Sequence, residues 1–204
     1  MRTHTCLLVS MGLLVATAYS VASASAALIT VGGDTSFDYT SIQPAINNAG
    51  TGDVISVAAG YYVEGTSTYR GNGFPTGLNF AYKNNISIIG SGPSTVIDLN
   101  SPSYGIMLDA SHGITMSNFA MWNGSYTAVT NFNGSSNNLI KDAIFGGTYS
   151  HIVKDYYNGV TLSNVTLDPD FTPQVESTPE PSTLAIWAGL GGIGLVVGWR
   201  RRRK

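Results

Sequence analysis

A repeat of 22 to 24 residues runs through the middle of this chain and restricts the folds that it can adopt. Each unit of the repeat begins with a tyrosine, at Tyr104, Tyr126 and Tyr149. Each unit also carries an Asn or Asp at a recurring position, at Asn118, Asp142 and Asn164. Within a unit, apolar residues alternate over short segments, as they do in strands with one buried face. Because one such unit cannot bury its apolar face alone, the units must stack on one another.

Stacked units of this kind predict an all-β fold, a parallel β-helix of about five coils with one unit per coil. Alternation places Ile114, Met116 and Phe119 in the interior, and an earlier, less regular coil is expected over residues 85–98. A sandwich of short antiparallel strands is the alternative. The sandwich does not explain why the tyrosines and the Asn or Asp residues recur along the chain.

The segment before the repeats predicts a short helix that closes one end of the stack. A strand is expected over residues 29–33, the helix over 41–49 with Ser41 as its N-cap, and a strand over 54–57. The helix has one apolar stripe, made of Ile42, Ala45, Ile46 and Ala49. Such a helix would cover apolar interior and unpaired strand edges. Residues 69–83, which contain several glycines and a proline, are expected to form a loop.

Residues 42–64 also carry a three-part motif. Residues 42–46 read I-Q-P-A-I, residues 49–57 read A-G-T-G-D-V-I-S-V, and residues 60–64 read G-Y-Y-V-E. The motif resembles the opening of pectin-lyase-like right-handed parallel β-helices, closely over about 40 residues and loosely over the coils that follow. The resemblance implies a right-handed β-helix domain over residues 27–172. The family includes enzymes that cleave acidic polysaccharides, and these enzymes use clustered Asp residues together with an Arg, Lys or His.

The chain has few residues suited to that chemistry. Arg70 is the only Arg between residues 27 and 182, and it falls in the expected loop. His112 and His151 fall at different points of their coils and are interpreted as surface or turn residues. Asp168 and Asp170 do not make a calcium site by themselves. We therefore predict no catalytic residue, no metal and no cofactor.

The repeating tyrosines are the candidates for a binding role. Stacked at the surface, Tyr104, Tyr126 and Tyr149 would form an aromatic platform for sugars, and the alternative is that they pack a coil boundary. Asp109 and Asn131 occupy similar points of successive units, with Lys154 one position on, and Asp109 is a further candidate for glycan contact. The recurring residues Asn118, Asp142 and Asn164 are expected to form an inward ladder of hydrogen bonds at a coil corner.

The amino-terminal end predicts a signal peptide over residues 1–26. Arg2 precedes an apolar stretch at residues 7–18, and small residues follow. This order is typical of a secretory signal, with cleavage of an A-x-A site after Ala24 or Ala26. Cys6 is the only cysteine, so the processed chain would contain neither a disulfide nor a thiolate metal site.

The carboxyl-terminal end predicts a membrane anchor. Residues 183–199 form an uncharged apolar run, which as a helix is about 25 Å long and suffices for a short transmembrane span. A basic cluster follows and is expected to remain in the cytoplasm, namely Arg200, Arg201, Arg202, Arg203 and Lys204. The residues before 183 would then lie outside the cytoplasm. A buried helix of a soluble protein is the alternative.

A linker over residues 173–182 places Pro179, Glu180 and Pro181 directly before the apolar run. The order of this motif, an apolar helix and a basic cluster resembles the PEP-CTERM sorting signal of exopolysaccharide-producing, biofilm-forming bacteria. The resemblance implies an exosortase as partner, a membrane enzyme that removes the tail near the motif. A proline-rich linker before an ordinary anchor is the alternative.

Charge narrows the range of partners. Between residues 27 and 182 the chain has twelve acidic and four basic residues, a formal charge of −8, which argues against nucleic-acid binding. Our hypothesis is an exported protein, first anchored in the inner membrane and then released to the surface or medium. It would be a non-catalytic structural or adhesive component of an exopolysaccharide or biofilm matrix. A small polysaccharide lyase or glycoside hydrolase is the alternative, and a periplasmic assembly factor is a third.

Overall fold

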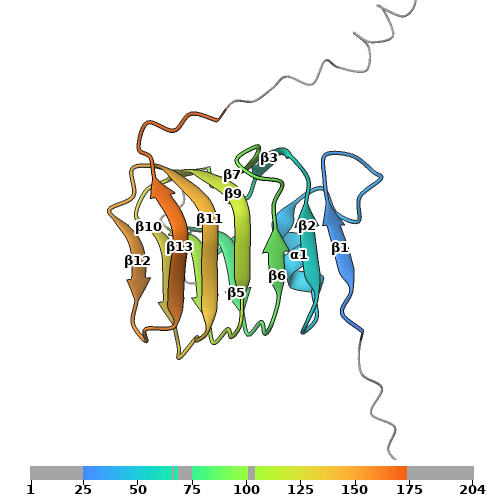
Figure 1. Ribbon diagram of the computed structural model, residues 1–204, viewed down its shortest axis with the longest axis horizontal. Coiled ribbons are helices and arrows are strands. Elements are labelled where there is room, and N and C mark those ends of the chain that lie inside the picture. Colours follow the sequence, from blue (N-terminus) through green and yellow to red (C-terminus); the bar gives the residue numbers. More distant parts are fainter. Residues whose placement is uncertain (1–24, 66, 69–74, 101–103, 174–204) are drawn as a thin grey trace, which may run out of the picture.

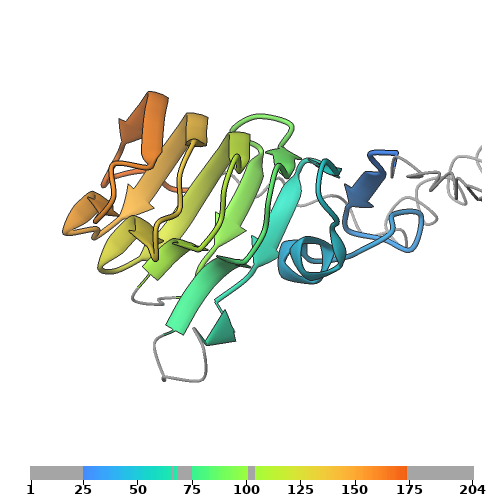
Figure 2. The same cartoon turned by 90° about the horizontal axis from the view of Figure 1, so that it is seen from below.

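The computed structural model describes residues 25–65, 67–68, 75–100 and 104–173. Over these residues the chain forms a parallel β-solenoid of about five turns with one short helix (Figures 1 and 2). Every strand pair in the described part is parallel except the pairing of β4 with β5. Parallel pairing confirms the predicted stack of coils and excludes the antiparallel sandwich.

Two sheets line the solenoid. Sheet A contains β1 (Leu28–Val31), β2 (Val54–Val57), β6 (Ser87–Ile89), β9 (Thr115–Gly124), β11 (Asn138–Gly147) and β13 (Val160–Leu167), with β3 (Gly60–Val63) and β7 (Thr95–Asp98) joined to it. Sheet B contains β4 (Ser67–Thr68), β5 (Pro75–Ala81), β8 (Tyr104–Asp109), β10 (Thr127–Phe132) and β12 (His151–Asp155). The helix is α1 (Ile42–Asn48). Each of the later coils therefore passes through sheet B, turns, and continues through sheet A.

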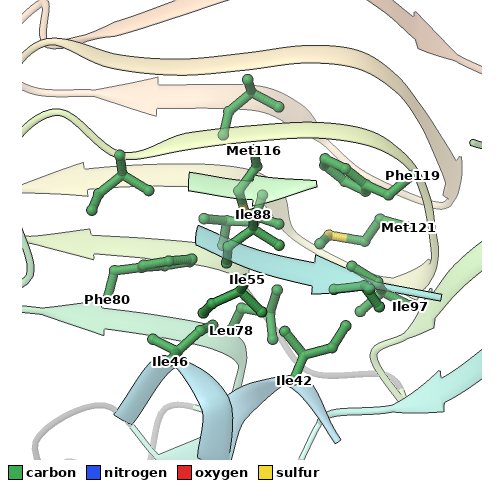
Figure 3. Packing of buried hydrophobic residues seen from close by; sticks show 14 of the residues in the cluster. Ile42, Ile46, Ile55, Leu78, Phe80, Ile88, Ile97, Met116, Phe119 and Met121 are labelled. Carbon is green, nitrogen blue, oxygen red and sulfur yellow. The ribbon is translucent and has the colours of Figure 1, made fainter. Parts of the chain in front are cut away.

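The strand register aligns apolar side chains into columns that run along the solenoid. One column in sheet A contains Ile29, Ile55, Ile88, Met116, Ile140 and Leu162. Figure 3 shows Ile55, Ile88 and Met116 inside the core, beside Leu78 and Phe80 of sheet B. Ile114, Met116 and Phe119 are all buried, as alternation predicted. Lateral stacking of like residues thus buries a face that no single coil could bury.

The strands of sheet A bend at the recurring Asn and Asp positions. Asn118, Asp142 and Asn164 have φ angles of 60°, 51° and 51°, in the left-handed region that Asn and Asp tolerate best among residues other than Gly. Asp142 and Asn164 are exposed, and the Asn164 side-chain amide donates to the Asp142 carboxylate at 2.8 Å. The predicted ladder therefore exists between these two residues, but its predicted inward direction was wrong, because the bend turns the side chains toward solvent.

The predicted loop over residues 69–83 was wrong in its second half. Strand β5 occupies Pro75–Ala81 and buries Leu78 and Phe80. Gly77 does not break this strand; a Cβ atom there would lie 2.2 Å from a methyl carbon of Leu99. The close approach of Leu99 thus requires a glycine at this position of the strand. In the sequence, such a glycine cannot be told from the glycines of a loop.

Helix α1 closes the amino-terminal end of the solenoid, as predicted. Its buried face packs on the first coils, and Figure 3 shows Ile42 and Ile46 next to Leu78 and Ile55. Ser41 is at the N-cap position, but its side chain makes no capping hydrogen bond. The buried Glu64 carboxylate instead accepts the backbone N–H groups of Ile42 and Gln43. An anion at the start of a helix satisfies free N–H groups and suits the helix dipole.

Polar side chains also cover the free strand edges at this end. The Gln43 side-chain amide accepts from the Asn79 backbone N–H at 2.8 Å and donates to the Asn79 carbonyl at 3.0 Å, as a neighbouring strand would. On the outermost strand of sheet A, the Thr30 N–H donates to the Asp38 carboxylate at 2.8 Å, and the Thr30 carbonyl accepts from the Tyr39 N–H at 3.1 Å. Unpaired edges of β5 and β1 are thereby satisfied.

The carboxyl-terminal end is built differently. Strands β12 and β13 each have a strand neighbour on one side only within residues 25–173 that the structure describes. The inward column of Phe80 and Leu108 becomes polar in the last two coils, where Asn131 and Asp155 continue it. Leu167 is 39% exposed. The interior therefore becomes more polar and more open toward this end.

The predicted membrane anchor and sorting motif lie outside the described residues, as does nearly all of the predicted signal peptide. No helix in the described ranges has the length and hydropathy needed to cross a bilayer.

Candidate functional site

The outer face of sheet B carries the candidate surface, and Tyr104 and Tyr126 lie together on it. Their ring centroids are 5.6 Å apart and the rings are nearly perpendicular. The Tyr126 ring in turn lies 6.1 Å from the His151 ring. An aromatic row therefore crosses three coils, as the repeat predicted, but its third member is His151.

Tyr149 does not join this row because the strand register differs from the sequence spacing of the tyrosines. Thr127 pairs with Tyr104 and His151 pairs with Thr127, so the strand steps are 23 and 24 residues. The Tyr149 ring instead packs 6.0 Å from the Phe145 ring. Burial raises the pKa of the Tyr149 phenol. This tyrosine has the packing role that the sequence left as the alternative.

Asp109 is fully buried, and its neighbours differ from those predicted. It pairs with Ala81 and Phe132 in adjacent strands, and its carboxylate accepts from the Asn133 side-chain amide. Asn131 aligns with Asp155 instead, and its side-chain amide donates to that carboxylate at 2.7 Å. The predicted alignment of Asp109 with Asn131 was therefore wrong by one residue. The glycan contact of Asp109 stays a prediction, and we build the surface from exposed side chains.

Lys154 and Tyr156 complete the exposed surface. The Lys154 ammonium lies 5.6 Å from the Tyr126 ring centroid and 5.4 Å from the Tyr156 ring centroid, within the range of cation–π contacts. Tyr156 stacks on Phe132 with centroids 5.1 Å apart and an interplanar angle of 17°. A hydrogen bond from Lys154 to Tyr156 raises the pKa of the lysine, which is therefore charged at neutral pH. The sequence placed Lys154 near this face but gave no sign of Tyr156.

Strand alternation explains why these side chains point outward. Val153 packs against the core, so Lys154 and Tyr156 project from the opposite face of β12 or its continuation. Tyr126 is 38% exposed and Tyr156 is 52% exposed. We call Tyr126, Lys154 and Tyr156 the tyrosine–lysine surface. Two exposed rings with a cation between them can contact a hydroxyl-bearing ligand.

The other titratable side chains that the structure describes make local contacts. His112 and His151 are exposed, as predicted, and each contacts a serine hydroxyl, at 2.9 Å and 3.1 Å. The Asp168 carboxylate accepts the Asp170 backbone N–H within a local turn. Within residues 25–65, 67–68, 75–100 and 104–173 there is no group of three or more His, Cys, Asp or Glu side chains that could hold a metal ion. Arg70 lies outside the described residues.

Comparison with known proteins adds no family assignment. No protein-family model matches the chain, and no curated protein matches it either. The resemblances of residues 42–64 and of the tail therefore stand on the motifs alone.

Proposed function

We propose that this chain is an exported, non-catalytic β-solenoid that binds extracellular polysaccharide through the tyrosine–lysine surface. The observation that carries the proposal is the position of Lys154 between the exposed rings of Tyr126 and Tyr156. In this role the protein is a structural or adhesive component of an exopolysaccharide matrix. The pectin-lyase-like motif at residues 42–64 supports a right-handed β-helix that contacts carbohydrate.

The chemistry of the surface suits a neutral sugar polymer. The apolar face of a pyranose ring packs on an aromatic ring, while an ammonium group donates hydrogen bonds to sugar hydroxyls. The formal charge of −8 between residues 27 and 182 repels anionic chains at a distance. We therefore expect neutral glycans to bind more tightly than uronate-rich glycans, and this difference should shrink at high salt.

Binding tests follow from the exposed rings. Affinity electrophoresis on neutral polysaccharide gels should show retardation, and Tyr126→Ala or Tyr156→Ala should weaken binding about tenfold, because each removes about 1.4 kcal/mol of ring contact. Tyr157→Ala is the matched control, since Tyr157 is 54% exposed, adjacent in sequence, and without a ring contact among the described residues. Equal loss in all three variants would contradict the proposed surface. Release of unsaturated product from acidic polysaccharides would favour the lyase alternative instead.

We also infer that the carboxyl-terminal tail, residues 179–204, directs the β-solenoid to the inner membrane and then to release. The order of Pro179, Glu180 and Pro181, the apolar run at 183–199 and the basic cluster at 200–204 supports insertion in the inner membrane and later processing by an exosortase. In a host with this enzyme, Glu180→Ala should leave the protein in the inner membrane. Fractionation that finds the variant at the surface, at the parent level, would contradict the sorting role.

A further inference from the structure

We propose that export processing ends at Ala26, so that the mature protein begins at Ala27 and its terminal ammonium group pairs with the Asp53 carboxylate. The inference rests on the proposed export of the chain. It decides between the two small-residue triplets at which a signal peptidase could cut, Ala22-Ser23-Ala24 and Ala24-Ser25-Ala26.

Ala27 is held by hydrogen bonds at both its backbone N–H and its backbone carbonyl. Its backbone N–H donates to Asp53 Oδ1 at 2.8 Å, and its carbonyl accepts from the Val54 N–H at 2.9 Å. Ser25 and Ala26 are exposed and precede the first strand, β1, which lies at the edge of the molecule in Figure 1. The ordered ladder of sheet A therefore begins at Ala27.

Asp53 is suited to receive a positive charge. Its second oxygen accepts the Gly50 N–H at 2.7 Å, which fixes the carboxylate in a tight turn. Hydrogen bonds from Ala27 and Gly50 lower the pKa of Asp53, and the charge of Lys83 contributes least among the causes of the shift. The Lys83 ammonium itself donates to the Asn47 and Ala49 carbonyls at 2.8 and 2.9 Å. The carboxylate is thus held by the backbone nitrogens of Gly50 and Ala27, and of these two only the Ala27 nitrogen could become a terminal amine.

Cleavage after Ala26 would change the nature of this contact. It breaks the Ala26–Ala27 peptide bond by hydrolysis, leaves a carboxylate on the released signal peptide, and turns the Ala27 nitrogen into an ammonium group with three donors. A charge-assisted hydrogen bond to a carboxylate is stronger than one from a neutral amide. Cleavage after Ala24 would place the ammonium group two residues away, about 7 Å along an extended chain, and keep the weaker amide contact.

The amino-terminal residue of the exported protein tests the site directly. The full chain, produced in an exporting host, is recovered from the periplasm or medium and analysed by intact mass and terminal sequencing. A first residue of Ala27 is the expected result. A first residue of Ser25, or any other internal start, overturns the inference while leaving export intact. Retention of Met1 on a chain that stays in the cytoplasm contradicts the proposed export, and the inference falls with it.

The ion pair is tested by the pKa of the terminal amine, measured by NMR on the processed protein. We expect a value above the usual range of about 7.7–8.0. Asp53→Asn should return it to that range, and Asp34→Asn, which removes an equal charge from an exposed turn, should leave it raised. Protein that retains Ser25 and Ala26 keeps Asp53 and should also show the usual value. A usual value in the Ala27-terminated parent would overturn the pairing.

The pH dependence of stability gives a second test of the ion pair between Ala27 and Asp53. Because folding raises the pKa of the terminal amine, its contribution is present below about pH 7.7 and is lost as the pH rises through the raised value. The Tm advantage of the parent over Asp53→Asn should therefore decrease by about 2 °C between pH 7 and pH 10. A constant advantage across this range would contradict a charged partner for Asp53.

Discussion

At each end of a coil stack, the apolar interior and the free backbone groups of the last strands must be covered. The two ends of this solenoid differ in how the described residues do so. At the amino-terminal end, α1 covers the interior, and Gln43 and Glu64 satisfy backbone groups of β5 and of the helix itself. At the carboxyl-terminal end, β12 and β13 are the last strands among the described residues, and the inward column ends in Asn131 and Asp155. The comparison teaches that closing a coil stack requires polar side chains matched to free backbone groups, in addition to apolar cover.

The largest effect is expected from the apolar contact of the helix. Ile46 is fully buried, so Ile46→Ala should lower the free energy of unfolding by about 2–5 kcal/mol in urea titrations. Leu162→Ala is the matched change in the last coil, where the side chain is only partly buried, and it should cost about half as much or less. Equal losses would mean that the two ends are equally well packed.

Glu64 should be the most important polar residue of the closed end. Glu64→Ala leaves the Ile42 and Gln43 N–H groups without their buried acceptor, which should cost about 1–3 kcal/mol of unfolding free energy. Glu64→Gln retains one acceptor oxygen and should cost less. If chemical denaturation finds Glu64→Ala neutral, water replaces the carboxylate at no cost, and the closed end does not depend on it.

Gln43 provides a smaller effect at the same end. Gln43→Leu keeps the apolar part of the side chain but removes both hydrogen bonds to Asn79, so we expect a loss of about 1–2 kcal/mol. Amide exchange at Asn79 should accelerate in this variant, while exchange at Met107 in the neighbouring strand β8 should change little. Unchanged protection at Asn79 would show that Gln43 does not act as a substitute strand.

The smallest effects are opposite responses of the two ends to pH. Burial raises the pKa of Glu64 above its ordinary 4.5, although its hydrogen bonds from Ile42 and Gln43 partly offset this. Burial also raises the pKa of Asp155, but hydrogen bonds from Asn131, Tyr157 and Val160 outweigh it and hold the pKa below 3.8. Glu64 therefore stabilises most below about pH 4.5 and less as the pH rises, whereas Asp155 stabilises above about pH 3.8 and loses this contribution on acidification.

Paired variants separate these responses. Between pH 3 and pH 7, the stability advantage of the parent over Glu64→Gln should decrease with rising pH, and its advantage over Asp155→Asn should increase. Thermal unfolding at each pH measures both differences. Slopes of the same sign would contradict the contrast between the two ends.

Local patterns predicted the coil stack, and long-range contacts explain what the sequence did not predict. Alternation correctly placed Met116 and Phe119 in the core, and the apolar stripe of Ile42 and Ile46 correctly predicted a capping helix. Glu64 could not be identified as the helix cap because it lies 22 residues from Ile42 in the chain. The sequence rule for helix caps considers only residues next to the helix, so it predicts Ser41. It cannot predict a carboxylate that comes from another coil.

The candidate surface was predicted in part for a related reason. Spacing brought Tyr104 and Tyr126 together correctly, because their strands are adjacent and nearly in register. It misplaced Tyr149, because this residue precedes the start of β12 and packs on Phe145, while His151 takes the third place in the row. Tyr156 lies just beyond the end of β12, outside the segments in which the sequence repeat is evident, so only the structure brings it to Lys154.

Hydrogen exchange of the backbone amides tests the contrast between the ends most directly. The intact domain, measured by mass spectrometry under native conditions, should show strong protection in β2 and α1 and markedly faster exchange in β12 and β13, because the last strands have a partner on one side only within the described chain. Protection of β13 equal to that of β2 would contradict the account, since it would show that the carboxyl-terminal end is closed as well.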